Sequence, residues 1–309
     1  MLSLIVPVYR NAANIPSLLA ALERLDGALD GRMEVVFVVD GSPDESYAIL
    51  AVELRNVSFR VQLIDLSRNF GSFAAIQVGL AEARGTHMAV MAADLQEPSE
   101  LVIEFDRLLC GDEADVVVGA RVARSDPRMT KMFSGLYWKL YRKLVQPETP
   151  PGGIDIFGCN ARVRDIIVAM RERNSSLVGL LLWAGFRRIE VPYQRRPREV
   201  GRSSWTFSKK LRYMTDSVYG FTDLPVRLLT RIGLVGVIGS TAFGAIVAIA
   251  RLEGAIAIPG YAATIIMVTF FGALNCLGLG IIGNYVWRTF ENTKNRPNAI
   301  IASRHTFQE

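Results

Sequence analysis

The sequence predicts an α/β domain that is followed by amphipathic helices at a membrane interface and by two C-terminal transmembrane helices. Three observations support this fold class. Short apolar runs alternate with helical patterns over the first half of the 309-residue chain. A segment that mixes aromatic and basic residues comes next. The last third is dominated by two long uncharged runs, so a soluble domain and a membrane part are both expected.

The first half of the chain has the pattern of a mostly parallel sheet. Its β-branched apolar runs predict buried strands at Leu2–Val8, Met33–Val39, Phe59–Leu66, His87–Met91 and Ala114–Gly119. Helical spacing lies between them, at Asn14–Leu25, Pro43–Arg55, Gly71–Ala83 and Ser99–Leu109. Continuous apolar strands separated by helices are typical of a sheet covered on both faces. Ligands of such sheets bind beyond the carboxyl ends of the strands, so polar residues there are the first candidates for chemistry.

Two uncharged runs predict the transmembrane helices. Ile232–Ala250 has 19 residues without a charge, which is enough to cross a hydrocarbon core of about 30 Å. Tyr261–Trp287 is longer still, and a pair of buried helices in a soluble protein is the disfavoured alternative. Basic residues flank the pair at Arg227, Arg231, Arg288, Lys294 and Arg296. The positive-inside rule therefore places both ends of the pair, and the domain before it, in the cytoplasm.

Basic residues gather in two stretches, although the net charge is only +5. Nine basic residues face two acids between Arg187 and Arg212, and Asp126 is the single acid between Arg121 and Lys143. Such clusters attract the phosphates of nucleotides, nucleic acids or lipid headgroups, and a solvated helix face is the alternative. The stretch from Arg187 to Arg212 leads into a membrane segment, and no nucleic-acid-binding module is recognisable in the sequence. A nucleic-acid partner is therefore disfavoured.

Aromatic and basic residues are interleaved over Trp205–Leu228, just ahead of the first apolar run. This composition predicts helices that lie in the membrane interface. An amphipathic helix packed on the soluble domain is the alternative, and both interpretations can hold together.

The cysteines indicate a reducing compartment. The chain has three, Cys110, Cys159 and Cys276, at wide spacings that match no zinc, redox or disulfide framework. The first apolar stretch, Leu2–Val8, is too short for a secretory signal, lacks a basic flank and is interrupted by Pro7.

Polar residues follow the second and fourth predicted strands. Asp40 opens an Asp-Gly-Ser turn that suits hydrogen bonding to a base or ribose, although this is also a common turn sequence. Asp94 and Gln96 occupy alternate positions and offer two oxygen ligands to a hard divalent cation on a pyrophosphate. Glu97 before Pro98 has a simpler explanation as the start of the next helix.

Two later features complete the candidate site. Asp155 is a lone carboxylate in an uncharged stretch, and catalytic and structural roles are equally open for it. The loop from Arg198 to Trp205 combines guanidinium groups, a glycine and hydroxyls next to the membrane segment, which favours a phosphate clamp.

With these motifs, nearly the whole chain resembles the family-2 glycosyltransferases of the GT-A fold, and within them the polyprenyl-phosphate enzymes of the bactoprenol glucosyltransferase and dolichol-phosphate mannose synthase type. The matching N-terminal motifs are Val6-Pro7-Val8-Tyr9, Asp40-Gly41-Ser42-Pro43-Asp44, Leu66-Ser67-Arg68-Asn69-Phe70-Gly71 and Asp94-Leu95-Gln96-Glu97-Pro98. The later ones are Asp155, the Arg198–Trp205 loop, Leu224-Pro225-Val226-Arg227, Ile258-Pro259-Gly260-Tyr261, the segment from Gly278 to Tyr285, and Lys294-Asn295-Arg296-Pro297.

The resemblance implies a fold, an activity and a role for each matching position. The fold is a GT-A nucleotide-sugar-binding, Rossmann-like domain, and Asp155 is the expected catalytic carboxylate. The expected donor-binding residues are Pro7, Tyr9, Asp40, Ser67 and Asp94. Asp94 and Gln96 are expected to hold Mg²⁺ or Mn²⁺. Acceptor or donor phosphate is expected to bind Arg121, Arg198, Arg202 and Ser203.

The sequence departs from the family pattern at several acids. Val39 stands where the family usually has the first acid of Asp-Asp-Gly-Ser, and Ala92 stands where it has the first acid of Asp-Ala-Asp. Ala12 and Ala13 lie where acids often follow the first strand, and Asn284 replaces a common Glu. Loss of a carboxylate at Ala92 is expected to weaken metal binding, because affinity for hard cations rises with ligand charge.

The expected reaction is transfer of a hexose, most simply glucose from UDP-glucose, to undecaprenyl phosphate with inversion. The expected organisation is a cytoplasmic catalytic domain (1–203), juxtamembrane helices (204–230), two transmembrane helices (231–287) and a cytoplasmic tail (288–309). The expected location is the bacterial inner membrane, and small residues in the spans permit a homo-oligomer. A polysaccharide synthase is one alternative, and a degenerate, non-catalytic nucleotide-sugar- or lipid-binding protein is the other.

Overall fold

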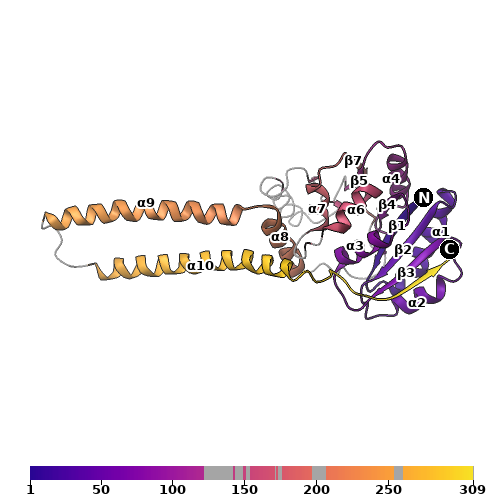
Figure 1. Cartoon of the computed structure of the whole chain (residues 1–309), viewed down its shortest axis with the longest axis horizontal. Helices are drawn as coiled ribbons and strands as arrows, with labels where there is room; N and C mark the ends of the chain where they lie inside the picture. Colours follow the sequence, from indigo (N-terminus) through magenta and orange to yellow (C-terminus); the bar gives the residue numbers. More distant parts are fainter. Residues whose placement is uncertain are drawn as a thin grey trace. The chain divides into compact units, whose positions relative to one another are not determined.

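The computed structural model describes residues 1–121, 142, 149–150, 154–170, 172, 176–196, 207–253 and 260–308 (Figure 1). The chain forms two compact units. Unit 1 contains residues 1–213 and 296–309, and unit 2 contains residues 214–295. The last residues of the chain therefore belong to the same unit as the first.

Unit 1 is built on one eight-stranded sheet with the order β7-β5-β6-β4-β1-β2-β3-β8. Its strands are β1 (Leu2–Val8), β2 (Met33–Val39), β3 (Arg60–Leu66), β4 (His87–Val90), β5 (Val116–Arg121), β6 (Ile154–Asn160), β7 (Arg188–Tyr193) and β8 (Ile301–Phe307). Strands β1 to β4 are mutually parallel, and β5 is parallel to β7. Strand β6 runs antiparallel to β4 and β5, and β8 runs antiparallel to β3.

Helices cover both faces of this sheet. They are η1 (Ala12–Asn14), α1 (Ile15–Ala28), α2 (Ser46–Glu53), α3 (Ser72–Glu82), α4 (Glu100–Cys110), α6 (Ala161–Ala169) and α7 (Leu177–Trp183). The larger core joins α1, α2 and α4 to one face of the strands, with Phe37 and Phe105 fully buried in it. On the other face α3 packs against β1 and β2. Truncating a fully buried Phe to Ala typically costs about 3–5 kcal/mol, so this packing fixes the sheet firmly.

The five predicted strands are present with ends that shift by two residues at most. The sheet is mixed, because β6 and β8 run antiparallel to their neighbours. The sequence analysis did not predict β6, β7 or β8. Strand β8 is the clearest difference: the stretch expected to be a C-terminal tail returns to the sheet and pairs with β3 from Val61↔Phe307 to Leu66↔Ile301. Tyr47 and Ser303 also join their hydroxyl oxygens at 3.0 Å.

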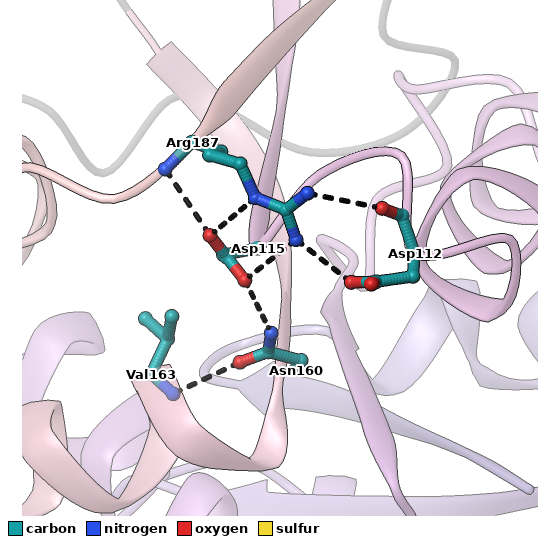
Figure 2. A network of polar contacts seen from close by, with 5 residues as sticks. All are labelled: Asp112, Asp115, Asn160, Val163 and Arg187. Carbon is teal, nitrogen blue, oxygen red and sulfur yellow. Dashed lines mark hydrogen bonds and ion pairs between the residues drawn. The ribbon is translucent and has the colours of Figure 1, made fainter.

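A polar network ties β5, β6 and β7 together at the sheet edge where β5 and β7 begin (Figure 2). The guanidinium of Arg187 donates to Asp112 at 2.7 Å and to Asp115 at 3.1 Å. Asn160 donates to Asp115 at 2.9 Å and caps α6 by accepting the Val163 amide at 3.0 Å. The Arg187 side chain holds the pKa of Asp115 below its usual value, so the pair is ionised at neutral pH.

Unit 2 contains two long apolar helices, α9 (Leu224–Leu252) and α10 (Tyr261–Thr293), of 29 and 33 residues. At 1.5 Å per residue they are about 44 and 50 Å long, and both lengths exceed the thickness of a hydrocarbon core. Both are long and apolar enough to cross a membrane, over Leu224–Phe243 and Phe270–Thr293. Gly236 faces Phe271 and Gly278 faces Leu229, so small residues let these two helices approach one another.

The end of α8 (Phe207–Phe221) packs on the C-terminal part of α10. Arg288 donates to Asp216 at 2.5 Å, and its guanidinium lies over the ring of Tyr219. Tyr285 stacks edge-on against Tyr219 at 5.0 Å and donates its hydroxyl proton to the carbonyl of Thr222 at 3.1 Å. The aromatic and basic residues predicted to lie at a membrane interface are thus partly used in contacts within unit 2.

Candidate active site

The polar residues singled out by sequence lie along one edge of the sheet. Tyr9, Asp40 and Ser67 directly follow β1, β2 and β3, and Asp94 follows β4 after a short turn. These four strands are parallel and adjacent, so their carboxyl ends share an edge. The chain order reverses between β1 and β4, which is the switch point where open α/β sheets bind ligands.

Pro7 lies inside β1 rather than after it, paired with Val38. Its missing amide costs no ladder bond, because the pairing of β1 with β4 stops at Ile5↔Val90. The early departure of β4 opens the edge of the sheet next to Pro7 and Tyr9.

Asp40 is buried and organises the turn that follows β3. Its carboxylate accepts the Phe70 amide at 2.6 Å and the Gly71 amide at 2.9 Å, and its carbonyl accepts the Asn69 side chain at 3.2 Å. Only 2% of the residue is exposed. Donor contact by Asp40 stays a prediction, and the structure gives the carboxylate a second role in holding residues 69–71.

A second carboxylate fixes the segment after β1. Asp44 accepts the hydroxyls of Ser42 at 2.6 Å and Ser46 at 2.7 Å, and the Ala12 amide at 3.2 Å. Partial burial raises the pKa of Asp44, but these hydrogen bonds outweigh it and the pKa lies below its usual value. Asp44 is therefore a structural anion that locks the β1 and β2 turns together.

Arg10 is a site residue that the sequence analysis did not assign. Its backbone has φ +56°, a left-handed conformation that non-glycine residues adopt rarely. The Arg10 amide donates to Ser42 Oγ at 2.8 Å, and its guanidinium lies 5.4 Å from the centre of the Tyr9 ring. An exposed cation is thereby held at the switch point, and its place directly after Pro-Val-Tyr was the available signal.

The segment after β4 links the two expected metal ligands through a backbone hydrogen bond. Asp94 Oδ1 accepts the Gln96 amide at 3.3 Å, and the intervening Leu95 has φ +54°. The side-chain amide nitrogen of Gln96 donates a hydrogen bond to Arg196 O at 3.3 Å. One carboxylate and one amide oxygen suit Mg²⁺ or Mn²⁺, which take hard oxygen ligands and complete their shells with phosphate oxygens and water.

The residues that follow β7 are anchored to the segment after β4. Arg195 Nε lies 3.4 Å from Glu97 Oε1, and the Glu97 side chain is 1% exposed. The Arg196 amide donates to Gln96 O at 2.8 Å. Glu97 does not start α4, which begins at Glu100 with Ser99 as its N-cap. Its buried carboxylate instead pairs with the half-buried Arg195 and fixes where the chain leaves β7 relative to Asp94.

The remaining predicted residues divide into two groups. Arg121 ends β5, and Asp155 is the second residue of β6. Because β6 is antiparallel to β4 and β5, its first residues lie at the edge where those strands end. The side chain of Asp155 is not among those described, and Arg198, Arg202 and Ser203 lie outside the described residues.

Ser67 completes the row at the far side of β2. Its side chain is exposed, and its amide donates to Ile300 O at 2.9 Å, just before β8. Beside it, the Arg68 guanidinium stacks 4.0 Å from the centre of the Phe70 ring. In sheet order the expected donor residues Ser67, Asp40, Tyr9 and Asp94 therefore precede Asp155 and Arg121.

The sequence profile of glycosyl transferase family 2 matches residues 3–169, more than half of the chain. The chain belongs to this family. It is a family 2 glycosyltransferase enzyme with a GT-A-like mixed sheet and two long apolar C-terminal helices.

Relatives of this family 2 enzyme align with it over nearly its whole length. It is 29% identical to the prophage bactoprenol glucosyl transferase homolog of Escherichia coli K12, over 97% of this chain and 98% of the other. It is also 29% identical to the bactoprenol glucosyl transferase of Shigella phage SfII, over 98% of both chains. A similar solved structure is the mannosyltransferase PcManGT of Pyrobaculum calidifontis in complex with GDP-Man and Mn²⁺, with 14% identity, a TM-score of 0.47, and 93% and 87% of the two chains covered.

Proposed function

We propose that this family 2 enzyme transfers glucose from UDP-glucose to undecaprenyl phosphate on the cytoplasmic leaflet of the bacterial inner membrane. The observation that carries the proposal is the full-length similarity to bactoprenol glucosyl transferases, which includes both candidate membrane helices. A polyprenyl acceptor keeps its tail in the bilayer, so an enzyme that is held there by such helices can reach its phosphate.

The topology of the chain agrees with this location. The first strand, β1, and the last, β8, belong to one sheet, so both termini lie on the same side of any membrane that α9 and α10 cross. Basic residues flank the outer ends of α9 and α10, which favours the cytoplasmic side by the positive-inside rule. UDP-glucose and the sheet edge that is proposed to bind it then share one compartment.

The proposed reaction is a single displacement. A phosphate oxygen of the acceptor forms a bond to the anomeric carbon of glucose, while the bond from that carbon to the UDP oxygen breaks and its electron pair leaves with UDP. Attack in line with the departing group inverts the anomeric configuration. The acceptor phosphate is already an anion, so no strong general base is required.

Each group of residues along the sheet edge has a proposed role. Tyr9, Asp40 and Ser67, with Pro7, bind or shape the donor pocket beside the switch point. Asp94 and Gln96 hold Mg²⁺ or Mn²⁺, which when bound offsets the charge of the departing diphosphate. Asp155 orients the acceptor or stabilises positive charge on the sugar ring. The acceptor phosphate is proposed to bind Arg121, Arg198, Arg202 and Ser203.

The direct test uses detergent-purified full-length enzyme, undecaprenyl phosphate and a panel of radiolabelled UDP- and GDP-sugars, with Mn²⁺ or Mg²⁺ and then with EDTA. Label is expected to enter the lipid phase from UDP-glucose and to stop doing so in EDTA. Asp94→Asn and Asp155→Asn are expected to lower turnover by about 10²–10³-fold. Asp165→Asn is the matched control, because this carboxyl side chain is 68% exposed on α6.

Two outcomes would contradict the proposal. Lipid-phase label from another donor and not from UDP-glucose would replace the donor. Absence of label with every donor, in enzyme that still binds UDP, would refute polyprenyl phosphate transfer altogether.

A further inference from the structure

Three side chains that can bind metal meet at the end of the sheet opposite the candidate active site. His87 is the first residue of β4, and Asp106 and Cys110 lie one helical turn apart at the end of α4. Their ligand atoms all lie within 4.8 Å of one another. Strand β4 leads toward the Asp94 segment and α4 leads away from it, so the cluster joins the two element ends that are farthest from that segment.

The two separations measured from Cys110 match those in a tetrahedral site. Cys110 Sγ lies 3.5 Å from His87 Nδ1 and 3.5 Å from Asp106 Oδ1. With metal–sulfur bonds of about 2.3 Å and metal–nitrogen or metal–oxygen bonds of about 2.0–2.2 Å, two ligands of a tetrahedral Zn²⁺ ion are about 3.5 Å apart. The two distances from Cys110 Sγ, which are those of weak hydrogen bonds, are thus also the distances expected between two ligands of one ion.

The exposure of the groups suits a site that an ion can enter from solvent. Asp106 is only 7% exposed, whereas Cys110 is exposed and leaves a path for an ion to enter.

We propose that His87, Asp106 and Cys110 form a second cation site, for Zn²⁺ or a similar borderline-soft divalent ion, with water as the fourth ligand. The site is distinct from Asp94 and Gln96, whose oxygen ligands suit a hard cation. Bound metal cross-links the start of β4 to the end of α4 and so stabilises the two elements on either side of the Asp94 segment.

The experiment adds Co²⁺ to the full-length, reduced enzyme in detergent and records its absorption spectrum. Thiolate bound to Co²⁺ gives a charge-transfer band in the near ultraviolet, and tetrahedral geometry gives intense visible bands. An all-oxygen site at Asp94 gives neither, so this readout is independent of glucosyl transfer and of whether that proposal holds. Both bands are expected in the wild-type enzyme, and Zn²⁺ is expected to displace them.

Three variants and one control decide the assignment. Cys110→Ser is expected to abolish the thiolate band, and Asp106→Asn and His87→Asn to weaken Zn²⁺ binding at least about 100-fold, the upper end of the cost of losing an outer-shell partner. Cys276→Ser, in α10, is the matched control and is expected to retain the bands. Zn²⁺ is expected to raise the Tm of wild-type enzyme and not of Cys110→Ser, a variant that exposure of the residue allows to fold. Absence of the bands in wild type, or their survival in Cys110→Ser, would overturn the site.

Discussion

Replacement of Asp40 by Asn tests which of two roles this carboxylate has. It is proposed to bind the sugar donor, and it also holds the turn at residues 69–71. The carboxylate accepts the Phe70 and Gly71 amides at 2.6 and 2.9 Å and is almost completely buried. The Asn side chain keeps one acceptor oxygen but points an amide nitrogen at the second peptide N–H. One charge-assisted hydrogen bond is lost, and a buried donor is left without its acceptor.

The expected cost follows from these two contacts. A hydrogen bond to a charged group contributes about 1.5–3 kcal/mol, and an unsatisfied buried donor costs a comparable amount, with partial relaxation of the turn. We expect Asp40→Asn to lower the free energy of unfolding by about 2–3 kcal/mol. For a unit of this size each kcal/mol shifts Tm by about 2–4 °C, so the expected fall is about 4–12 °C.

The assay is thermal unfolding of the full-length enzyme in detergent, followed by intrinsic fluorescence at one scan rate, together with the KM for UDP-glucose. Asp30→Asn is the control, because Asp30 is an exposed acid in a left-handed turn that Asn also tolerates. If Asp40→Asn retains the wild-type Tm and raises only the donor KM, the carboxylate binds donor and the argument from the turn is wrong.

Three further predictions concern other parts of unit 1. Gly41→Ala is expected to destabilise the enzyme by about 2 kcal/mol or more, because Gly41 has φ +53° and the new Cβ would lie 2.3 Å from the Arg68 carbonyl carbon. Gly27→Ala is the control in the same thermal unfolding assay: its Cβ meets nothing within 4 Å, so Tm should stay unchanged or rise. Truncation after Pro297 removes β8 and is expected to lower Tm and promote aggregation through the open β3 edge, as seen by light scattering, whereas deletion of residues 308–309 alone should do neither. Asp115→Asn is expected to lower Tm at pH 7, because Arg187 depresses the pKa of Asp115 in the folded state. That stabilisation is present above the unfolded-state pKa of about 3.9 and is lost as the pH falls through the folded value, so a Tm difference that persists below this range would contradict the ion pair.

The sequence was sufficient where structure is local. The apolar run of β2 is fully buried, and that of β1 is buried except at the half-buried Pro7. Such runs, bounded by turn residues, are recognisable without knowledge of their partners. The order of the strands also placed Asp40 and Asp94 at one edge. Strand β8 was missed because its pairing partner, β3, lies more than 230 residues earlier in the chain. Nothing within Ile301–Phe307 specifies that partner.

The same limit applies to side chains whose role depends on distant neighbours. Glu97 was expected at most to start a helix, and its ion pair with Arg195 spans about one third of the chain. The cysteines matched no metal-binding spacing, yet folding brings Cys110 to His87 from another element. Spacing rules detect ligands that share one loop or helix, and they are blind to sites assembled from a strand and a helix. Arg10 differs, because its position after β1 was visible and only its left-handed backbone was not.

The position of β8 has a consequence for the order in which the protein is made. Residues 301–307 leave the ribosome only after both long apolar helices have been synthesised, so the outer edge of β3 remains unpaired until then. The donor-side turn at Ser67, which bonds to Ile300, is completed at the same late moment. A chain that stalls or is cleaved before β8 therefore has the candidate site residues but an incomplete sheet. The eight-stranded sheet can therefore be completed only after both candidate membrane helices have been synthesised.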